Sequence, residues 1–320
     1  MIEGDYKTEM ENNRIENKFC ACLGSDNVYR DELMKKHTTF RIGGPADYYL
    51  CPHSAKEIQQ IVEICREERI PYFILGNGSN LLVSDKGYRG VVIQLWKNVS
   101  DIRTEGRLIY AKAGASLAKI AAEALEEGLT GMEFAAGIPG TLGGAVVMNA
   151  GAYGGEMKDI LKEVLVMDHQ GKIFQLQKEE LKLGYRTSIV KEKNYIVLAA
   201  VLELKEGDKA EIQKLMEELR ERRTEKQPLD MPSAGSTFKR PEGYFAGKLI
   251  MDAGLRGFSV GGAQISEKHC GFVVNKGGAT ARDVLELIQE VQKRVHEKFG
   301  VELETEVKFL GEFEEELCGL

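Results

Sequence analysis

The sequence predicts an α+β protein, and three observations favour that class. Strand-like runs alternate with amphipathic helical patterns, but their spacing is too uneven for a regular βαβ array. The length of 320 residues suggests about two domains, and we find no tandem repeat. Hydrophobic residues make up 43% of the chain, which is enough for a sizeable core and excludes global disorder.

Composition narrows the function classes. The net charge of −7 argues against nucleic acid or an anionic membrane as a partner, but it allows a local basic pocket for a phosphorylated small molecule. No apolar run approaches the roughly 20 residues of a membrane span. The charged residues 1–18 lack the apolar segment of a secretory signal, and we expect them to be a flexible tail. The six cysteines are scattered, which favours a reduced, cytoplasmic protein without a metal site.

Apolar periodicity predicts the elements of the first half. Ile58, Ile61, Val62 and Cys65 have helical spacing and predict a helix over 55–69, which Pro71 ends. Short apolar runs predict strands at 72–75, 91–95 and 108–111, and a helix follows at 116–127.

Apolar periodicity also predicts the elements of the second half. Strands are expected at 163–167, 173–176 and 195–204, at 263–266 and 271–275, and at 302–310, where side chains alternate. Helices are expected at 208–225, with Ile212, Leu215, Met216 and Leu219 inward, near 243–253, and at 280–299. The segment 227–237 is rich in turn residues, and the clearest domain boundary lies near 205–208.

Glycine is over-represented, because the chain has 35 glycines, whereas an average usage of roughly 7% would give about 22 in 320 residues. The loop Leu75–Leu81 (LGNGSNL) follows a strand, and its backbone N–H groups suit a phosphate, although a tight Asn-Gly turn explains it equally well. The run 137–155 is dense in glycine yet apolar, unlike a flexible linker. We favour a ligand at this run, since small residues let a ligand approach the backbone.

Three further segments are ambiguous when considered alone. Ser236 lies on a glycine turn beside Lys239 and Arg240 and could meet an anion, but a turn hydroxyl is the commoner role. Arg186 and Glu306 lie near strand ends, where such side chains are usually solvated. Gly257-Phe-Ser259-Val-Gly261 fits the nucleophile elbow of hydrolases, but a helical pattern precedes it and a short strand follows, which is the reverse of the required context.

Taken together, the segments resemble one family, the UDP-N-acetylenolpyruvoylglucosamine reductases of peptidoglycan synthesis. The resemblance covers about residues 37–310, and the motifs occur in family order. They are Thr38–Gly44 (TTFRIGG), Leu75–Leu81, the run 134–155, Tyr185-Arg186-x-Ser188, Gly235-Ser236-x-Phe238-Lys239-Arg240-Pro241, Ala246-Gly247-x-Leu249-Ile250 and Glu304-x-Glu306-Val307.

The resemblance implies an FAD-binding fold of the PCMH or vanillyl-alcohol-oxidase type, with two FAD-binding subdomains and a smaller α+β substrate-binding domain. The implied boundaries are 19–95, joined by a C-terminal strand from 302–320, then 96–206, and 207–301 for the substrate domain. The implied FAD-binding residues are Arg41, Gly76, Asn77, Gly78, Ser79, Asn80, Leu81, Gly137, Ile138, Pro139, Gly143, Gly144, Asn149, Ala150, Gly151, Ala152 and Gly154.

The implied reaction uses NADPH and FAD to reduce the enolpyruvyl ether of UDP-N-acetylglucosamine to UDP-N-acetylmuramate. By residue-to-residue transfer, Arg186 and Glu306 lie at the substrate carboxylate and Ser236 donates a proton. Glu306 would have to act in its acid form, because two carboxylates would repel. Tyr185, Lys226 and Arg240 match substrate-binding positions.

Alternatives remain open at this stage. An FAD-dependent oxidase of the same fold is one, and a serine hydrolase using Ser259 is a remote second. The short connection between Arg186 and Ser236 resembles the type II branch, which lacks a tyrosine-bearing loop, and Arg222, Arg223 and Arg240 are candidates for its replacement. We expect a small-molecule substrate and a monomer or weak oligomer.

Overall fold

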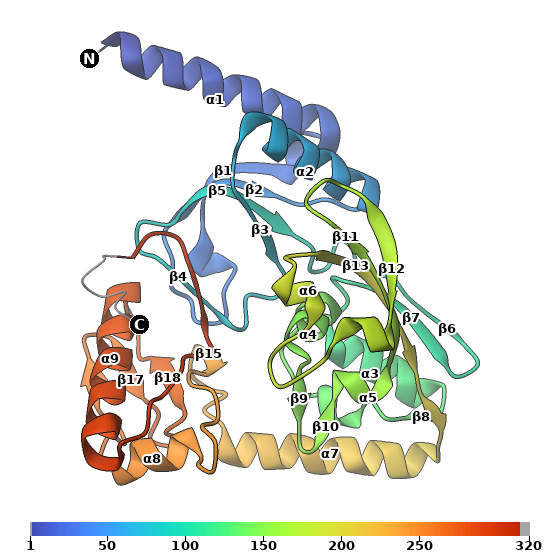
Figure 1. The fold of residues 1–320 in the computed structure, drawn as a ribbon, viewed down its shortest axis with the longest axis vertical. Coiled ribbons are helices and arrows are strands. Elements are labelled where there is room, and N and C mark those ends of the chain that lie inside the picture. The colour runs from blue at the N-terminus through green and yellow to red at the C-terminus, as the bar shows by residue number, and fades with distance from the viewer. Residues whose placement is uncertain (1, 314–320) are drawn as a thin grey trace. The chain divides into compact units, whose positions relative to one another are not determined.

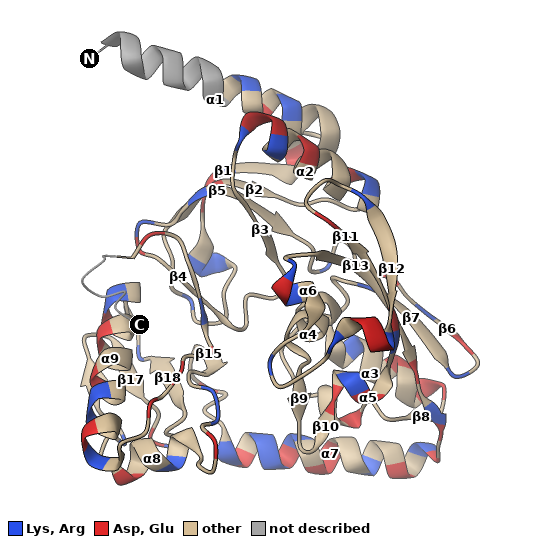
Figure 2. Ribbon diagram, in the orientation of Figure 1, with Lys and Arg blue, Asp and Glu red and all other residues tan. Residues whose placement is uncertain are grey.

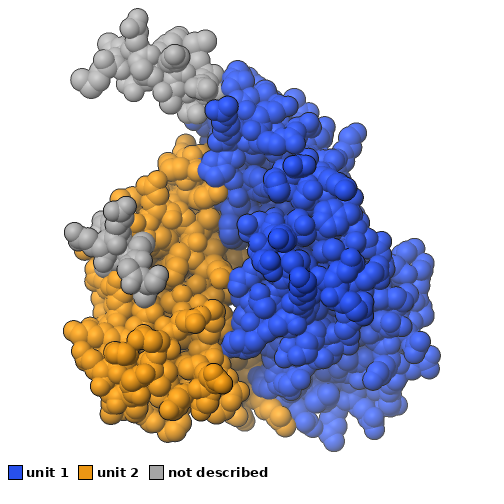
Figure 3. Space-filling model, viewed as in Figure 1, with its two compact units in different colours: residues 1–30, 48–76, 90–220 blue, residues 31–47, 77–89, 221–320 orange. Residues whose placement is uncertain are grey.

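The computed structural model describes residues 2–313, with side chains from residue 13 onward. Figure 1 shows its elements, and Figure 3 colours its two compact units. Unit 1 comprises residues 1–30, 48–76 and 90–220, and unit 2 comprises residues 31–47, 77–89 and 221–320. Each unit has its own hydrophobic core of buried residues. Helices and sheets occur in both, which confirms the α+β class.

The flexible tail expected over residues 1–18 is instead the beginning of a helix, α1 (Ile2–Leu23). Ile15, Phe19 and Leu23 are buried, and the Phe19 ring meets Tyr48 edge to face with centroids 5.4 Å apart. Helical spacing of these three residues gives an otherwise polar helix one apolar stripe. The stripe packs into the core of unit 1, which explains why polar composition was a poor guide here.

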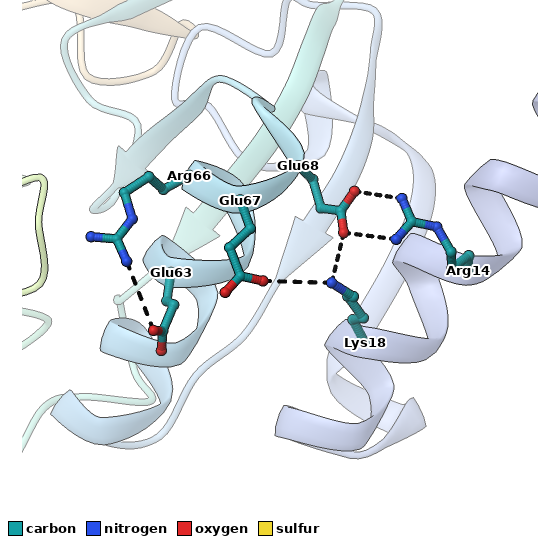
Figure 4. Close-up of polar contacts among 6 residues, drawn as sticks. All are labelled: Arg14, Lys18, Glu63, Arg66, Glu67 and Glu68. Carbon is teal, nitrogen blue, oxygen red and sulfur yellow. Dashed lines mark hydrogen bonds and ion pairs between the residues drawn. The ribbon is translucent and has the colours of Figure 1, made fainter.

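Polar contacts also join α1 to α2 (Ala55–Glu68). Figure 4 shows Arg14 and Lys18 of α1 reaching Glu68 at the end of α2. Arg14 Nη1 lies 2.9 Å from Glu68 Oε1, and Lys18 Nζ lies 2.6 Å from the same oxygen. These hydrogen bonds lower the pKa of the Glu68 carboxyl to about 2. The pairing therefore operates with Glu68 ionised.

Unit 1 is built on two larger sheets. One has the order β1-β2-β5-β3, with β3 parallel to β5, and the other is the antiparallel sheet β12-β11-β13-β7-β6. The strands are β1 (Val28–Leu33), β2 (Pro45–Leu50), β3 (Tyr72–Leu75), β5 (Tyr88–Gln94), β6 (Ile102–Glu105), β7 (Leu108–Lys112), β11 (Leu161–Met167), β12 (Ile173–Gln177) and β13 (Ile196–Glu203). The boundary between units falls within β1, β2, β5 and α7 (Lys209–Lys226).

Shorter elements complete unit 1. They are α3 (Leu117–Glu126), β8 (Leu129–Thr130), α4 (Leu142–Met148), β9 (Gly151–Ala152), β10 (Gly155–Glu156), α5 (Met157–Ile160), α6 (Ile189–Glu192) and β14 (Lys205–Glu206). Ser116 and Ser188 cap α3 and α6, since their hydroxyls accept backbone N–H groups of the first turn. The glycine-rich run thus contains a helix and a hairpin.

Unit 2 combines a four-stranded antiparallel sheet with two helices and a parallel strand pair. The sheet has the order β15-β18-β17-β16, formed by β15 (Ser233–Ser236), β16 (Ser259–Val260), β17 (Ala263–Ile265) and β18 (Phe272–Asn275). The helices are α8 (Ala246–Asp252) and α9 (Ala281–Phe299). β4 (Leu81–Val83) pairs in parallel with β19 (Lys308–Leu310). This pairing places the segment that follows residue 80 next to the last described strand of the chain.

Three expectations need correction. The strand expected over 302–310 is confined to Lys308–Leu310, because residues 304–306 follow an irregular path with one bridge, Phe238 to Thr305. The turn-rich segment 227–237 contains β15, which pairs with β18 through an irregular register. Charges of both signs are interspersed along α7 (Figure 2), and Leu215 is 42% exposed rather than inward, because Ile212 and Leu219 form the buried side of α7.

The units also divide the chain differently from the expected domains. Residues 77–89 belong to unit 2 because β4 pairs with β19. Residues 207–220 belong to unit 1. There the N–H of Gly207 donates to the Gly128 carbonyl.

Candidate active site

In unit 2, Ser236 and Glu306 lie on neighbouring segments. The N–H of Glu306 donates to the Thr237 carbonyl at 2.8 Å, and the N–H of Lys239 donates to the Glu304 carbonyl at 2.8 Å. The bridge between Phe238 and Thr305 lies between these two bonds. Two of the three residues that the resemblance assigns to catalysis are therefore brought together by backbone pairing.

The Ser236 hydroxyl is available to a ligand. The side chain is half-buried, and its hydroxyl makes no hydrogen bond with any residue that the structure describes. The next residue differs, because Thr237 is buried and its hydroxyl accepts the N–H of Val273 at 3.0 Å. Thr237 thus anchors the segment to β18 and leaves Ser236 as the hydroxyl that can meet a substrate.

The two acidic residues of the 304–306 segment have different surroundings. Glu304 is exposed and paired with the Lys239 ammonium, whose hydrogen bond lowers the pKa of the Glu304 carboxyl. Glu306 is half-buried. Glu304 therefore remains ionised at neutral pH and forms the surface ion pair. Glu306 lies on the segment whose backbone is paired with the Ser236–Thr237 segment.

Residues 77–80 form a loop that suits an anion. Gly78 has φ +61°, in the left-handed region, and its carbonyl accepts the N–H of Thr39 at 3.2 Å. Among the described residues, no acceptor receives the backbone N–H groups of Gly78, Ser79 and Asn80, and the Ser79 hydroxyl has no partner. Successive unpaired N–H groups around a left-handed residue form a nest that binds phosphate oxygens. The FAD pyrophosphate contact that the resemblance implies for this loop stays a prediction.

The loop also adjoins the Ser236 segment. A Cβ built on Gly235 would lie 3.9 Å from the Ser79 carbonyl oxygen. Leu81, the last residue of the predicted loop, is buried and begins β4. Asn77 and Arg41 belong to unit 2 as well, and Arg41 is exposed with φ +56°. Gly76, in contrast, belongs to unit 1, where a Cβ would lie 2.5 Å from Thr141 Oγ1.

The other predicted FAD-binding residues follow the run 137–154 in unit 1. Gly137, Pro139 and Gly144 are exposed, Ile138, Ala150, Gly151 and Ala152 are half-buried, and Gly143 and Asn149 are buried. Tyr153 and Gly154, with φ +53° and +91°, form the tip of the β9–β10 hairpin. A Cβ on Gly154 would meet no atom within 4 Å, whereas one on Gly143 would crowd Ala113 at 3.1 Å.

The Asn149 side chain is fully engaged within unit 1. Its amide donates to Glu156 Oε2 at 2.8 Å and to the Gly184 carbonyl at 3.0 Å, and its oxygen accepts the N–H of Lys158. Asn149 also has φ +41° at the end of α4. Any contact of this residue with a cofactor therefore falls to its backbone.

Arg186 lies on a tight turn of unit 1. Gly184 and Thr187 exchange backbone hydrogen bonds around it, and Arg186 itself has φ +55°. The Lys191 ammonium donates to the Arg186 carbonyl at 3.0 Å. The Arg186 guanidinium lies 5.3 Å from the ring centre of Tyr185, and the Tyr185 side chain is 56% exposed. The approach of Arg186 to Ser236 and Glu306 of unit 2 remains a prediction.

The predicted substrate-binding cations of unit 2 are exposed. Lys226 is the last residue of α7, and Arg240 follows the Ser236 segment. The Arg240 guanidinium lies 4.0 Å from the centre of the Phe245 ring, and its Nε donates to the Tyr244 carbonyl at 3.3 Å. These contacts orient the Arg240 guanidinium, and a guanidinium suits an anionic ligand.

The hydrolase alternative using Ser259 lacks its required geometry. Ser259 begins the two-residue strand β16 rather than following a strand into a helix. The acid and base that follow Ser259 in hydrolase order are Asp283 and His296. Asp283 accepts the N–H of Thr280 in the α9 capping box and the N–H of Gly262, whereas His296 pairs with Glu302 near the other end of α9. Thirteen residues along a helix correspond to about 20 Å, too far for a triad.

The described residues contain neither a metal-binding cluster nor a membrane-spanning helix. No group of three His, Cys, Asp or Glu residues lies close enough to hold a metal ion within the part of the chain that the structure describes. Within the same residues, no helix combines the length and the apolarity that crossing a membrane requires.

Sequence reasoning missed two polar contacts to the backbone of candidate catalytic residues. The Asn80 amide donates to the Glu306 carbonyl at 3.2 Å, and Lys191 holds the Arg186 carbonyl as described above. The Lys191 contact follows from the helical start after Ser188, which had a recognisable capping residue. The Asn80 contact joins two residues that are 226 positions apart in the sequence, and no local sequence pattern predicts it.

Comparisons with known proteins indicate one family over most of the chain. The family profile described as UDP-N-acetylenolpyruvoylglucosamine reductase, C-terminal domain, matches residues 227–310, and an FAD binding domain profile matches residues 46–177. The UDP-N-acetylenolpyruvoylglucosamine reductase of Caldanaerobacter subterraneus subsp. tengcongensis is 57% identical over 92% of this chain and 97% of its own. That of Agathobacter rectalis is 59% identical over 89% and 95%.

A solved structure extends this similarity to the fold. The UDP-N-acetylenolpyruvylglucosamine reductase (MurB) from Thermus caldophilus matches with a TM-score of 0.76 at 41% identity, covering 88% of this chain and 98% of that one.

Proposed function

Because the chain belongs to the UDP-N-acetylenolpyruvoylglucosamine reductase family, it is an FAD- and NADPH-dependent oxidoreductase of peptidoglycan synthesis, and we propose that Ser236, Glu306 and Arg186 carry its chemistry. The substrate is UDP-N-acetylglucosamine enolpyruvate and the product is UDP-N-acetylmuramate. When bound, FAD supplies the hydride that it receives from NADPH. The remaining steps belong to residues of this chain.

Charge and proton transfer define the tasks of the three residues. Hydride addition to the terminal vinyl carbon leaves negative charge on the ether-bearing carbon, which is delocalised into the adjacent carboxylate. Arg186 provides a fixed cationic fork for that carboxylate. Glu306 in its acid form donates a hydrogen bond to it, because a second carboxylate would repel it. The Ser236 hydroxyl donates the proton to the ether-bearing carbon.

The observation that carries the proposal is the pairing of the Ser236 and Glu306 segments. The Glu306 N–H bond to Thr237 fixes the acid beside the serine segment, and the Ser236 hydroxyl has no partner among the described residues. The adjoining nest of residues 78–80 supplies the pyrophosphate contact. An acid, an uncommitted hydroxyl and an anion nest in one unit match the needs of this reaction.

Replacing Ser236 with alanine tests the assignment. We expect flavin reduction by NADPH to keep its wild-type rate, while reoxidation by the enolpyruvyl sugar nucleotide slows by about 10²- to 10⁴-fold, the usual contribution of a general acid. Ser233→Ala is a matched control, because Ser233 lies on the same strand, and its carbonyl rather than its hydroxyl binds Thr39. Anaerobic stopped-flow absorbance separates the two half-reactions, and equal slowing of both would contradict the role.

The oxidase alternative makes a different prediction. An oxidase would consume oxygen and would not need the sugar nucleotide. NADPH oxidation that depends on the enolpyruvyl sugar nucleotide, and continues without oxygen, distinguishes the reductase.

We further propose that the protein works in the cytoplasm as a monomer or weak oligomer. Its five described cysteines are free thiols, as expected in a reducing compartment. Light scattering after size-exclusion chromatography tests the oligomeric state, and a stable dimer at micromolar concentration would overturn it.

A further inference from the structure

Asn80 connects the anion nest with the candidate catalytic acid. Its backbone N–H is one of the three N–H groups of the nest that have no acceptor among the described residues, and its side-chain amide donates to the Glu306 carbonyl at 3.2 Å. Its own carbonyl accepts the N–H of Lys308 at 3.1 Å. Asn80 therefore contributes its backbone N–H to the anion nest, while its side-chain amide holds the segment that carries Glu306.

The backbone of Glu306 is held on both sides. Its N–H donates to Thr237 at 2.8 Å, and its carbonyl accepts the Asn80 amide. Fixing both peptide groups restricts φ and ψ of Glu306, and these angles set the direction of its side chain. The Thr237 bond ties Glu306 to the serine segment, and the Asn80 bond ties it to the nest.

We propose that Asn80 is a positioning residue for Glu306, setting the acid relative to the anion nest through its side-chain amide. The inference rests on the proposed function, since the task of Glu306 comes from it. The predicted cofactor contact of Asn80 uses its backbone N–H and not its side chain. Side-chain variants therefore separate positioning from cofactor binding.

Two variants remove the amide in different ways. Asn80→Ala deletes it, and Asn80→Asp keeps its size but replaces the donor with a carboxylate that repels the Glu306 carbonyl. In both variants we expect substrate-driven reoxidation of the flavin to slow by roughly 10- to 100-fold, the effect of a displaced catalytic group. Flavin reduction by NADPH, measured per bound flavin, should stay at the wild-type rate, and the half-saturating substrate concentration should change less than the rate.

The chain offers a matched control in Gln292. Its amide donates to the Leu303 carbonyl at 2.8 Å, so it makes the same kind of bond to the same segment three residues before Glu306. Its other polar atom, Oε1, is buried without a partner among the described residues. Gln292→Leu removes this donor from the segment, and we expect it not to slow reoxidation selectively. Selective slowing in Gln292→Leu equal to that in Asn80→Ala would overturn the proposal, as would wild-type reoxidation in both Asn80 variants.

A measurement on the flavin-free protein makes the test independent of turnover. Hydrogen–deuterium exchange of the peptide covering 304–308 should be faster in Asn80→Ala than in the wild type, and unchanged exchange would overturn the positioning role. If the wild-type enzyme is not reoxidised by the sugar nucleotide, the proposed function fails. The exchange result then still decides whether Asn80 holds Glu306.

Discussion

Replacing Gly78 with alanine tests whether the 77–80 loop is the anion nest. Gly78 has φ +61°, and an added Cβ would lie 2.2 Å from the His37 carbonyl oxygen and 2.9 Å from Thr38 Cα. An ordinary carbon–oxygen contact is about 3.3 Å or longer. The loop or the 37–38 segment must therefore move apart by about 1 Å.

The size of the effect follows from two contributions. A left-handed backbone costs alanine about 1–2 kcal/mol of folding free energy. A shift of about 1 Å also breaks hydrogen bonds from the nest to the pyrophosphate, and each bond to a charged acceptor contributes about 1.5–3 kcal/mol. Loss of two of the three N–H bonds would weaken FAD binding by about 3–6 kcal/mol, which is on the order of 10²- to 10⁴-fold in Kd.

Gly254→Ala isolates the second contribution. Gly254 has φ +79°, but a Cβ built there meets nothing within 4 Å. Both variants carry the left-handed penalty, and only Gly78→Ala has the overlap. Apoprotein of each variant is titrated with FAD by flavin fluorescence, and thermal unfolding of the apoprotein measures stability.

We expect both variants to lose stability and only Gly78→Ala to lose FAD affinity. Wild-type affinity in a folded Gly78→Ala variant would refute the nest, because the loop would then have moved without consequence for the pyrophosphate. A loss of affinity in Gly254→Ala as large as in Gly78→Ala would equally refute it, since the effect would come from general destabilisation.

The docking of α1 gives two further predictions. Phe19→Ala should lower the free energy of unfolding by about 3–5 kcal/mol, because the fully buried ring packs against Tyr48. Urea denaturation measures this free energy, and a loss below about 1 kcal/mol would contradict the packing. Glu68→Gln should lower Tm at neutral pH, because Arg14 and Lys18 lower the pKa of Glu68 and so stabilise the fold only while it is ionised. The difference from wild type should shrink as the pH falls from 4.5 through about 2, and a difference that does not shrink over this range would exclude the ion pairs as its source.

Helices with a strong apolar stripe could be predicted from the sequence. In α9, Val284, Leu287, Ile288 and Val291 are all buried, and Thr280 with Asp283 forms the capping box at its start. The strands β3 and β7 were equally clear, because short apolar runs end at turn residues. In these segments local propensity and burial agree, and no distant contact is needed.

Among the helices that escaped prediction, α1 and α4 did so for opposite reasons. α1 is polar, and the burial of Ile15 and Phe19 depends on contact with α2 and the sheet beside it, which is tertiary information. α4 includes Gly143 and Gly144, which local propensity disfavours in helices. Its place against β7 requires a small residue, since a Cβ on Gly143 would lie 3.1 Å from the Ala113 Cβ. Glycine there serves packing.

The glycine surplus therefore has two sources, and the sequence could not separate them. At Gly76 and Gly143 a side chain would collide with protein atoms, so these glycines are explained without any ligand. Gly78 combines such a collision with N–H groups of its loop that have no acceptor among the described residues, and only the three-dimensional path of residues 37–39 reveals both. The same holds for Asn80, whose motif predicted a cofactor contact. That contact stays a prediction, and the Asn80 side chain reaches Glu306, because β4 and β19 pair in parallel and bring residues 80 and 306 together. Motif order identified the segments of the site, and the pairing of distant strands decides which atom of each residue performs which task.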